Sequence, residues 1–210
     1  MIVVKVGGSL MADREKLVHL CKKVRELSLQ FPLIIVPGGG SFADEARVVS
    51  EKFSLPPTTS HFMAILAMNQ YGFLLHSLTE ESILSEEPRA ELGRATILLP
   101  YQFLRQNDIL PHSWSVTSDS ISAFIASYMN AERIVILKDV DGVFDSDPRS
   151  GEGRLLGEAF VEDVGGCLDD HFFHVLTTEC FVLNGFYPQR LEEFLKRGKT
   201  LGTTISHKHP

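Results

Sequence analysis

Residues 2–10 of this 210-residue chain read Ile-Val-Val-Lys-Val-Gly-Gly-Ser-Leu, and they give the first indication of the fold. The apolar, β-branched start of this stretch is typical of a short buried strand in an α/β sheet. Lys5 interrupts the run, and burying its ammonium costs too much desolvation unless it meets anionic groups at the end of the strand. The glycines that follow allow backbone amides to approach an anion. The stretch therefore indicates a phosphate-binding turn, with a Gly-Gly turn beside a snorkelling lysine as the alternative.

The length and composition are those of an ordinary globular protein that forms one large domain or two closely joined lobes. Hydrophobic residues make up 44% and charged residues 22% of the chain, and the net charge is -7. Such a charge disfavours binding to nucleic acid or to an anionic membrane. The three cysteines form no Cys-x-x-Cys pair, which indicates reduced thiols, and no apolar run reaches the ~20 residues of a membrane span. We therefore expect a soluble, cytoplasmic protein with neither nucleic acid nor membrane as a partner.

A second glycine-rich turn follows the next predicted strand. Residues 33–36 form a short apolar run that ends in the sequence Pro-Gly-Gly-Gly-Ser at 37–41, and a helix capped by Asp13 precedes it. Strand, helix and strand at this spacing form a βαβ unit, so the two strands should be parallel neighbours. Both glycine turns then lie at the carboxyl ends of their strands, where open α/β sheets bind ligands. The triple glycine predicts a ligand-facing loop, with a sharp packing turn as the alternative.

Two helices should follow this loop. The first, over 41–52, carries Asp44 and Arg47 on nearly one face. Arg47 could reach an anionic substrate, or it could form an ordinary surface pair with Asp44. The second helix, over 59–78, is apolar nearly all round, which favours a core or oligomer-interface helix. His61 on this helix could line a pocket or be a satisfied core residue.

The second half of the chain repeats the pattern of strand, turn and helix. Ser118 is a candidate cap that places Asp119 in the first turn of a helix, where the helix dipole stabilises a carboxylate. The next buried strand, over 134–137, runs into an aspartate-rich loop over 138–149. This loop lacks the glycine and glutamate placement of an EF-hand, so turn-forming or ribose-binding aspartates fit it better. A further helix is predicted over 167–176. Its Cys167, His171 and His174 could form three ligands of a zinc site, but no fourth ligand is evident in the sequence.

Four motifs occur in an informative order. They are Val-Lys-Val-Gly-Gly-Ser-Leu at 4–10, Val-Pro-Gly-Gly-Gly at 36–40, Thr-Ser-Asp-Ser-Ile-Ser-Ala at 117–123 and Asp-Val-Asp-Gly-Val-Phe-Asp-Ser-Asp-Pro at 139–148. Neither the P-loop pattern nor Gly-x-Gly-x-x-Gly occurs, which argues against P-loop kinases and dinucleotide enzymes. The order of the four motifs resembles the amino acid kinase family over essentially the whole chain.

The resemblance implies an α/β fold, a three-layer αβα sandwich with a mostly parallel central sheet. It implies a single amino acid kinase domain over 1–210, with an acceptor-binding lobe at about 1–112 and a nucleotide-binding lobe at about 113–210. It also implies ATP and Mg²⁺ as cofactors, a small phosphorylated acceptor and a homo-oligomer. The magnesium ion would be held largely by ATP, so no residue is assigned as a metal ligand.

The resemblance also implies roles for individual residues. Lys5 would neutralise the phosphoryl group in transfer, and Asp119 would orient the lysines. The residues implied for ATP are Gly7, Gly8, Ser9, Asp139, Asp141, Gly142, Val143, Phe144, Asp147 and Pro148. Those implied for the acceptor are Gly38, Gly39, Gly40, Asp44, Arg47 and Thr117.

One segment departs from the family pattern. Family members usually carry Gly-Gly-Met and then a lysine three residues after the methionine, whereas residues 165–170 here read Gly-Gly-Cys-Leu-Asp-Asp. Asp170 stands at the position of the lysine and would repel phosphate. We predict that Lys138 takes over the role of the missing cation as a third catalytic residue. The alternative is a weak or non-catalytic relative.

Finer patterns resemble a subgroup of the family that acts in methanofuran biosynthesis. They are Met-Asn-Gln at 68–70, Cys-Leu-Asp-Asp-His-Phe-Phe at 167–173 and Asn-Gly-Phe-Tyr-Pro at 184–188. The resemblance implies ATP-dependent transfer to an acceptor that is already a phosphomonoester, giving a diphosphate. The alternatives are a uridylate-kinase-like or carboxylate kinase of the same family, and a non-catalytic nucleotide-binding storage or regulatory protein.

Overall fold

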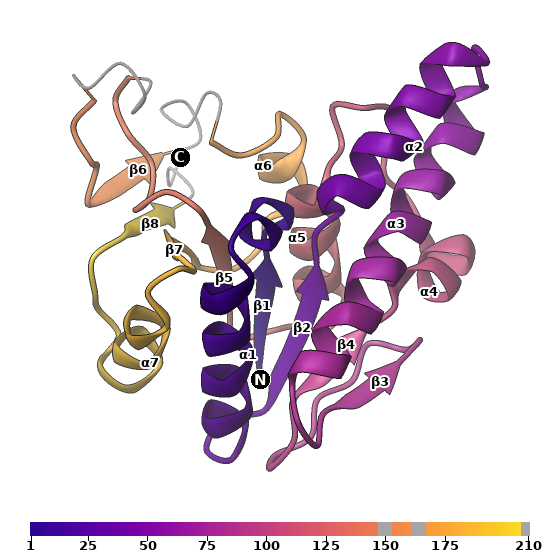
Figure 1. The fold of residues 1–210 in the computed structure, drawn as a ribbon. Helices are drawn as coiled ribbons and strands as arrows, with labels where there is room; N and C mark the ends of the chain where they lie inside the picture. Colours follow the sequence, from indigo (N-terminus) through magenta and orange to yellow (C-terminus); the bar gives the residue numbers. More distant parts are fainter. Residues whose placement is uncertain (147–152, 161–166, 207–210) are drawn as a thin grey trace.

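The computed structural model describes residues 1–146, 153–160 and 167–206, and within them one sheet of eight strands runs between helical layers (Figure 1). The strand order is β3-β4-β2-β1-β5-β7-β8-β6, and every pair of neighbours is parallel except β7 and β8. The strands are β1 (Ile2–Val6), β2 (Leu33–Pro37), β3 (Ile83–Ser85), β4 (Thr96–Leu98), β5 (Arg133–Lys138), β6 (Glu158–Phe160), β7 (Cys180–Asn184) and β8 (Thr203–Ser206). The prediction of an αβα sandwich with a mostly parallel sheet is confirmed.

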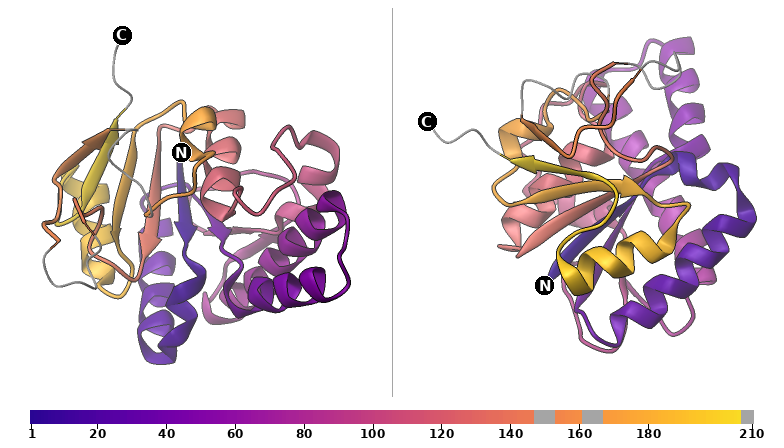
Figure 2. Two further views of the ribbon diagram at one scale, coloured as in Figure 1. Left: turned by 90° about the horizontal axis from the view of Figure 1, so that it is seen from above. Right: turned by 90° about the vertical axis from the view of Figure 1, so that its left-hand side faces the viewer.

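Helices cover both faces of this sheet, as the two views of Figure 2 show. The helices α1 and α7 pack on one face, and α4, α5 and α6 pack on the other, while α3 contributes to the core on both sides. The helices are η1 (Gly8–Ala12), α1 (Arg14–Ser28), α2 (Gly40–Lys52), α3 (Pro57–Leu78), α4 (Pro100–Asn107), α5 (Ser118–Tyr128), α6 (Phe172–Val175) and α7 (Pro188–Arg197). None of the helices in the described residues is long and apolar enough to cross a membrane.

Strand β1 shows why the first stretch of sequence reads as almost continuously apolar. Its side chains alternate between the faces of the sheet, so Val3 joins one core cluster while Val4 and Val6 join the other. Because helices cover both faces, both sets of side chains are buried. Lys5 is 5% exposed on the same strand and is the exception that requires a chemical explanation.

Three parallel strands bring the future site residues to one edge of the sheet. Strand β1 pairs with β2 on one side, as predicted, and with β5 on the other. Lys5 lies opposite Val36 in β2 and opposite Ile136 in β5. The carboxyl ends of the three strands therefore meet, and the chain leaves them through the two glycine turns and through Lys138.

The helix caps confirm one expectation and correct another. Asp13 caps α1 as predicted, because its carboxylate accepts a hydrogen bond from the backbone N–H of Lys16. The cap of α5 is Thr117, and the prediction of Ser118 was wrong. Thr117 has extended backbone angles and its Oγ1 accepts the N–H of Asp119 at 3.2 Å, whereas Ser118 is already helical. Asp119 still lies in the first turn, as expected.

Two further elements differ from expectation. The helix predicted over 167–176 is confined to α6, because the Asp169 carboxylate binds the start of α5 and holds the preceding residues as a loop. Strand β3 was not predicted, and it pairs with β4 in a region whose charged residues hide its short apolar run. Gly165, Gly166 and the two tail histidines, His207 and His209, lie outside the described residues.

Candidate active site

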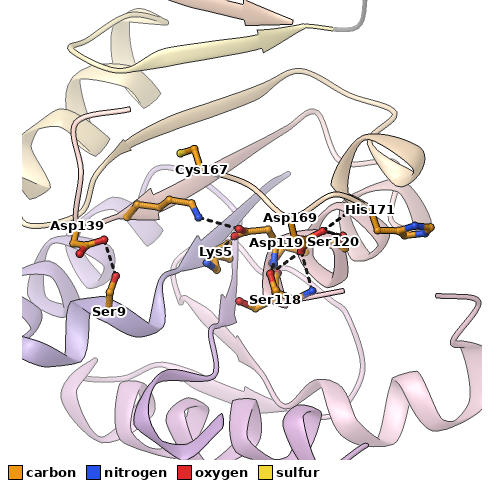
Figure 3. A network of polar contacts seen from close by, with 12 residues as sticks. Lys5, Ser9, Ser118, Asp119, Ser120, Asp139, Cys167, Asp169 and His171 are labelled. Atoms are coloured by element: carbon orange, nitrogen blue, oxygen red, sulfur yellow. Dashed lines mark hydrogen bonds and ion pairs between the residues drawn. The ribbon is translucent and has the colours of Figure 1, made fainter. Parts of the chain in front are cut away.

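A buried and a half-buried lysine share one buried aspartate at the carboxyl edge of the sheet (Figure 3). Lys5 Nζ forms an ion pair with Asp119 Oδ1 at 2.7 Å, and Lys138 Nζ donates a hydrogen bond to Asp119 Oδ2 at 2.9 Å. The lysines come from β1 and β5, which are neighbours in the sheet, and the aspartate comes from the first turn of α5. The Lys5–Asp119–Lys138 cluster therefore holds two positive charges against one negative charge.

The pKa values follow from this arrangement. Burial acts to raise the pKa of Asp119, but the two ammonium groups outweigh it and lower that pKa to about 2. Burial lowers the pKa of Lys5, against the opposing effect of Asp119. Burial also acts to lower the pKa of Lys138, but Asp119 prevails and the net direction is upward. Asp119 is consequently an anion that orients cations, and its low pKa makes it unsuitable as a proton acceptor near neutral pH.

The two glycine turns are packed directly against each other beside this cluster. A Cβ on Gly8 would lie 2.2 Å from the backbone N of Gly40, and a Cβ on Gly38 would lie 2.6 Å from the backbone N of Gly8. Gly40 also has a φ of 55°, in the left-handed region that favours glycine. Any side chain at Gly8 or Gly38 would push the turns apart. The glycines are therefore required for the close approach of two loops at neighbouring strand ends.

Further polar groups surround the cluster (Figure 3). Ser9 Oγ donates a hydrogen bond to Asp139 Oδ1 at 2.9 Å, linking the first glycine turn to the end of β5. The Asp169 carboxylate accepts hydrogen bonds from the backbone N–H and Oγ1 of Thr117, at 2.8 Å and 2.6 Å, and from Ser120. Asp169 thus occupies the N-terminus of α5, a position that the helix dipole makes favourable for an anion.

Two adjoining pockets meet at the glycine turns. The smaller pocket, of about 370 Å³, holds the lysine cluster together with Gly7, Asp139 and Asp169. The wider pocket, of about 600 Å³, is lined by the triple-glycine loop, α2, α3 and the start of α5. Gly8, Ser9 and Thr117 line both pockets. A molecule in the wider pocket can therefore reach toward a group held by the lysines.

The wider pocket contains the acceptor residues predicted from α2. Asp44 and Arg47 both line it, and no surface ion pair joins them in the described residues. The guanidinium of Arg47 lies over the ring of Trp114, 4.7 Å from its centroid. Among the predicted acceptor residues, Gly39, Gly40 and Thr117 also line this pocket, while Gly38 is packed behind them against Gly8.

His61 combines both of the interpretations that its sequence context allowed. Its ring is 6% exposed and lines the wider pocket, and its Nε2 hydrogen-bonds Asp108 Oδ2 at 2.7 Å. The ring of His112 stacks on it at 4.5 Å, so the loop that carries Trp114 is anchored to α3. The side-chain Oδ1 of Asn69, on the same helix, accepts a hydrogen bond from the backbone N–H of Tyr101 in the first turn of α4.

Four further residues predicted for the nucleotide lie along the loop after β5 and outside the lining of both pockets: Asp141, Gly142, Val143 and Phe144. Asp141 Oδ1 accepts hydrogen bonds from Asn184 Nδ2 at 3.0 Å and from Arg190 Nη1 at 2.6 Å. The N–H of Val143 donates to Thr203 Oγ1, and Phe144 forms an isolated bridge with Leu155. A Cβ on Gly142 would lie 2.5 Å from Thr203 Oγ1. Asp147 and Pro148 lie outside the described residues.

Sequence reasoning assigned no role to two residues that shape this site. Asp169 was quoted only as part of the segment in which Asp170 replaces the family lysine, yet Asp169 faces the cluster and Asp170 is exposed. Trp114 lies in a stretch for which the sequence analysis predicts no function, yet it lines the wider pocket. Trp114 is the single tryptophan of the chain and lies two residues after His112, and this combination is a signal in the sequence that indicates a ligand-contacting loop.

The fold and the site together define an αβα protein with a lysine–aspartate cluster and two glycine turns at the carboxyl edge of a mostly parallel sheet. Its sequence matches the profile of the amino acid kinase family over residues 1–166. The chain belongs to the amino acid kinase family, as its motifs predicted.

Relatives within the family are similar over different lengths. The chain is 30% identical to the [5-(aminomethyl)furan-3-yl]methyl phosphate kinase of Methanocaldococcus jannaschii over 98% of this chain and 97% of that protein. It is 27% identical to the uridylate kinase of Methanococcoides burtonii over 71% of this chain and 64% of that protein. The predicted resemblance to the subgroup of methanofuran biosynthesis is confirmed by the first of these.

Solved structures show the same fold. The crystal structure of uridylate kinase from Archaeoglobus fulgidus superposes with a TM-score of 0.76 at 19% identity, covering 98% of this chain and 99% of that one. An isopentenyl phosphate kinase structure gives 0.68 at 19% identity, covering 98% of this chain and 100% of that one.

Proposed function

We propose that this protein is an ATP-dependent kinase that phosphorylates a small phosphomonoester to a diphosphate, with [5-(aminomethyl)furan-3-yl]methyl phosphate as the acceptor. The observation that carries the proposal is the Lys5–Asp119–Lys138 cluster in a pocket that adjoins a wider one through shared lining residues. The full-length similarity to a kinase of that acceptor supports the choice of substrate.

The reaction requires little covalent chemistry from the protein. An oxygen of the acceptor phosphate attacks the γ-phosphorus of ATP, the bond to the β,γ-bridging oxygen breaks, and ADP leaves with that electron pair. A phosphomonoester loses its second proton at a pKa of roughly 6, so its oxygens are nucleophilic near neutral pH without a general base. This agrees with a site whose buried carboxylate is held by two lysines and has a pKa of about 2. Catalysis then rests on positioning and charge neutralisation.

We assign the roles as follows. Lys5 and Lys138 neutralise the charge that develops on the transferred group, and Asp119 fixes both ammonium groups. The N–H groups of Gly7 and Gly38 already donate to Leu137 O and Val6 O. We therefore assign the ATP phosphates to the remaining backbone amides of the first glycine turn, and the acceptor phosphate to those of the triple-glycine loop. The assignment of acceptor and nucleotide to the two halves of the chain belongs to the same proposal.

The donor set fits a magnesium ion that ATP itself carries. Asp119 is committed to two lysines and Asp169 to the N-terminus of α5, which leaves Asp139 and Ser9 as oxygen donors at the edge of the smaller pocket. When bound, Mg²⁺ would add positive charge to the phosphate oxygens.

The cellular compartment and the oligomeric state of the protein also belong to the proposal. The three cysteines are free thiols, two of them buried, which fits a reducing cytoplasm. Exposed apolar side chains on and after α2 and on α3, Val48, Phe53 and Phe73, fit a homo-oligomeric assembly.

An acceptor panel tests the proposal. ADP release is measured with MgATP and, in separate reactions, the aminomethylfuran phosphate, UMP, isopentenyl phosphate and acetylglutamate. We expect turnover with the aminomethylfuran phosphate to exceed the ATPase background and turnover with each of the others. Preferential turnover of UMP or of the carboxylate would support another kinase of the family, and turnover with none of them would contradict the proposal.

A further inference from the structure

The wider pocket contains a carboxylate that a phosphate-binding pocket alone does not explain. Asp44 lines this pocket from α2. None of the described residues forms an ion pair or hydrogen bond with its carboxylate. A negative side chain in the wall of a pocket that receives a doubly charged phosphomonoester weakens binding by Coulomb repulsion. The repulsion becomes an advantage only when the incoming molecule also carries a positive charge.

The nearest cation on the same helix does not neutralise Asp44. Arg47 follows it by three residues, but the Arg47 guanidinium lies over the ring of Trp114 at 4.7 Å from the centroid. A cation on an aromatic face is stabilised there, and the same contact fixes its position. The carboxylate of Asp44 is therefore available to a ligand.

The position of Asp44 along α2 sets a distance for that ligand. Helix α2 starts at Gly40 in the triple-glycine turn, and each helical residue adds about 1.5 Å along the axis. Asp44 is four residues further, so its backbone lies roughly 6 Å along the axis from the glycine turn. A phosphate at the turn and a cation at Asp44 therefore lie within the span of one small molecule that is several single bonds of about 1.5 Å long.

The rest of the wall of the wider pocket is suited to a flat apolar ring. Ile65 and Met68 of α3 and Val116 and Ile121 near the start of α5 line the wider pocket, and Trp114 adds an aromatic side. Apolar and aromatic walls with a few polar groups are typical of small-molecule sites.

We propose that Asp44 is the binding site for the ammonium group of the acceptor, and that the substrate class is a phosphomonoester of a small ring bearing a primary amine. This inference rests on the proposed kinase function and adds the residue that selects the substrate. Such an ion pair gives the site a reason to prefer a zwitterionic acceptor over a purely anionic phosphomonoester.

The test compares two acceptors and three proteins. The acceptors are the aminomethylfuran phosphate and its des-amino analogue, in which a methyl group replaces the aminomethyl group. The proteins are the wild type, Asp44→Asn and the matched control Glu45→Gln, which removes a neighbouring exposed carboxylate that lies outside the pocket lining. For each pair kcat/KM is measured for turnover and Kd for binding in the presence of MgADP, and circular dichroism checks folding.

We expect the wild type and Glu45→Gln to prefer the amine by about tenfold or more in kcat/KM, the size of a charge-assisted hydrogen bond at a partly exposed site. Asp44→Asn should reduce this preference to near one, mainly through KM, and should leave the des-amino acceptor unchanged or improved. A preference that survives in Asp44→Asn, or an equal loss with both acceptors, would overturn the inference while the kinase proposal stands.

The two proposals can also fail separately. If neither acceptor is phosphorylated, the kinase proposal is contradicted, and the Kd values still decide on Asp44. Equal binding of the amine and des-amino molecules by the wild type, or binding of neither, would overturn the ammonium site in that case too.

Discussion

The two adjoining pockets differ in the burial and the pairing of their charged side chains. In the smaller pocket, Lys5, Asp119 and Lys138 are largely buried and pair with one another, so their pKa values are shifted and their geometry is fixed by β1, β5 and α5. In the wider pocket, the charged side chains Asp44 and Arg47 are exposed on α2, and most of the surrounding wall is apolar or made of glycine.

This difference indicates a division of labour within the site. Buried charges are costly, and they are retained where their electrostatic effect on a reacting group is strong. Exposed charges are screened and suit the recognition of one molecule over another. We therefore expect substitutions in the smaller pocket to act mainly on kcat and substitutions in the wider pocket to act mainly on the KM of the acceptor.

The largest effect is expected from Lys5→Ala. Removing the most buried cation of the cluster should lower kcat by about 10³-fold, as the loss of a preorganised electrostatic donor does elsewhere. Steady-state ADP release measures this, with Lys22→Ala as the matched control because Lys22 is exposed on α1. Equal turnover by Lys5→Ala and the wild type would refute the assignment of this residue.

Lys138→Ala should have the next largest effect. Lys138 is less buried than Lys5, and we expect a fall of about 10²-fold in kcat with the Kd of MgATP changed by less than about threefold. Pre-steady-state turnover and nucleotide titration separate the two quantities. If only nucleotide affinity changes, Lys138 does not replace the family lysine missing at Asp170.

A smaller effect is expected in the wider pocket from Trp114→Ala. This substitution removes the aromatic wall of the pocket and the ring on which the Arg47 guanidinium lies. It should therefore raise the KM of the acceptor by about tenfold while the KM of ATP stays the same. Tyr187→Ala is a useful control, since Tyr187 carries a similar contact with Arg190 away from this pocket. A change in kcat alone, with the acceptor KM unaltered, would be inconsistent with the division of labour.

The smallest effect concerns pH and stability. The pKa of Asp119 is lowered in the folded protein to about 2 from 3.8, so its ion pairs stabilise the fold fully above pH ~4 and lose that contribution as the pH falls through about 2. The contribution is on the order of 2 kcal/mol in the free energy of unfolding. A ¹³C NMR titration of the Asp119 carboxyl group measures its pKa directly. A midpoint near the ordinary value would mean that the lysines do not hold this carboxylate in solution.

Much of the sheet and of its ligand edge could be predicted because local patterns set them. Continuous apolar runs predicted β1, β2 and β5, and the βαβ rule predicted that both glycine turns lie at one edge of the sheet. The desolvation cost of Lys5 required an anionic partner, and the structure supplies Asp119. These arguments depend on residues close in sequence or on general rules of topology.

The features of the site that could not be predicted from the sequence depend on contacts between distant segments. The carboxylate of Asp169 reaches the start of α5 across 49 to 52 residues, so no local pattern distinguishes it from Asp170. The partners of Asp141 come from β7 and α7, and the ring that supports Arg47 comes from the loop after α4. Thr117 and Ser118 are both good caps by residue type, and only the backbone angles decide between them.

The most direct test of the account is a crystal structure of the protein with a non-hydrolysable ATP analogue, Mg²⁺ and the aminomethylfuran phosphate. We predict oxygens of the γ-phosphate within about 3 Å of the Nζ atoms of Lys5 and Lys138, and the acceptor phosphate beside the triple-glycine turn. The account would be contradicted if the triphosphate bound elsewhere. In that result no phosphate would contact the two glycine turns, and both lysines would form ion pairs with Asp119 alone.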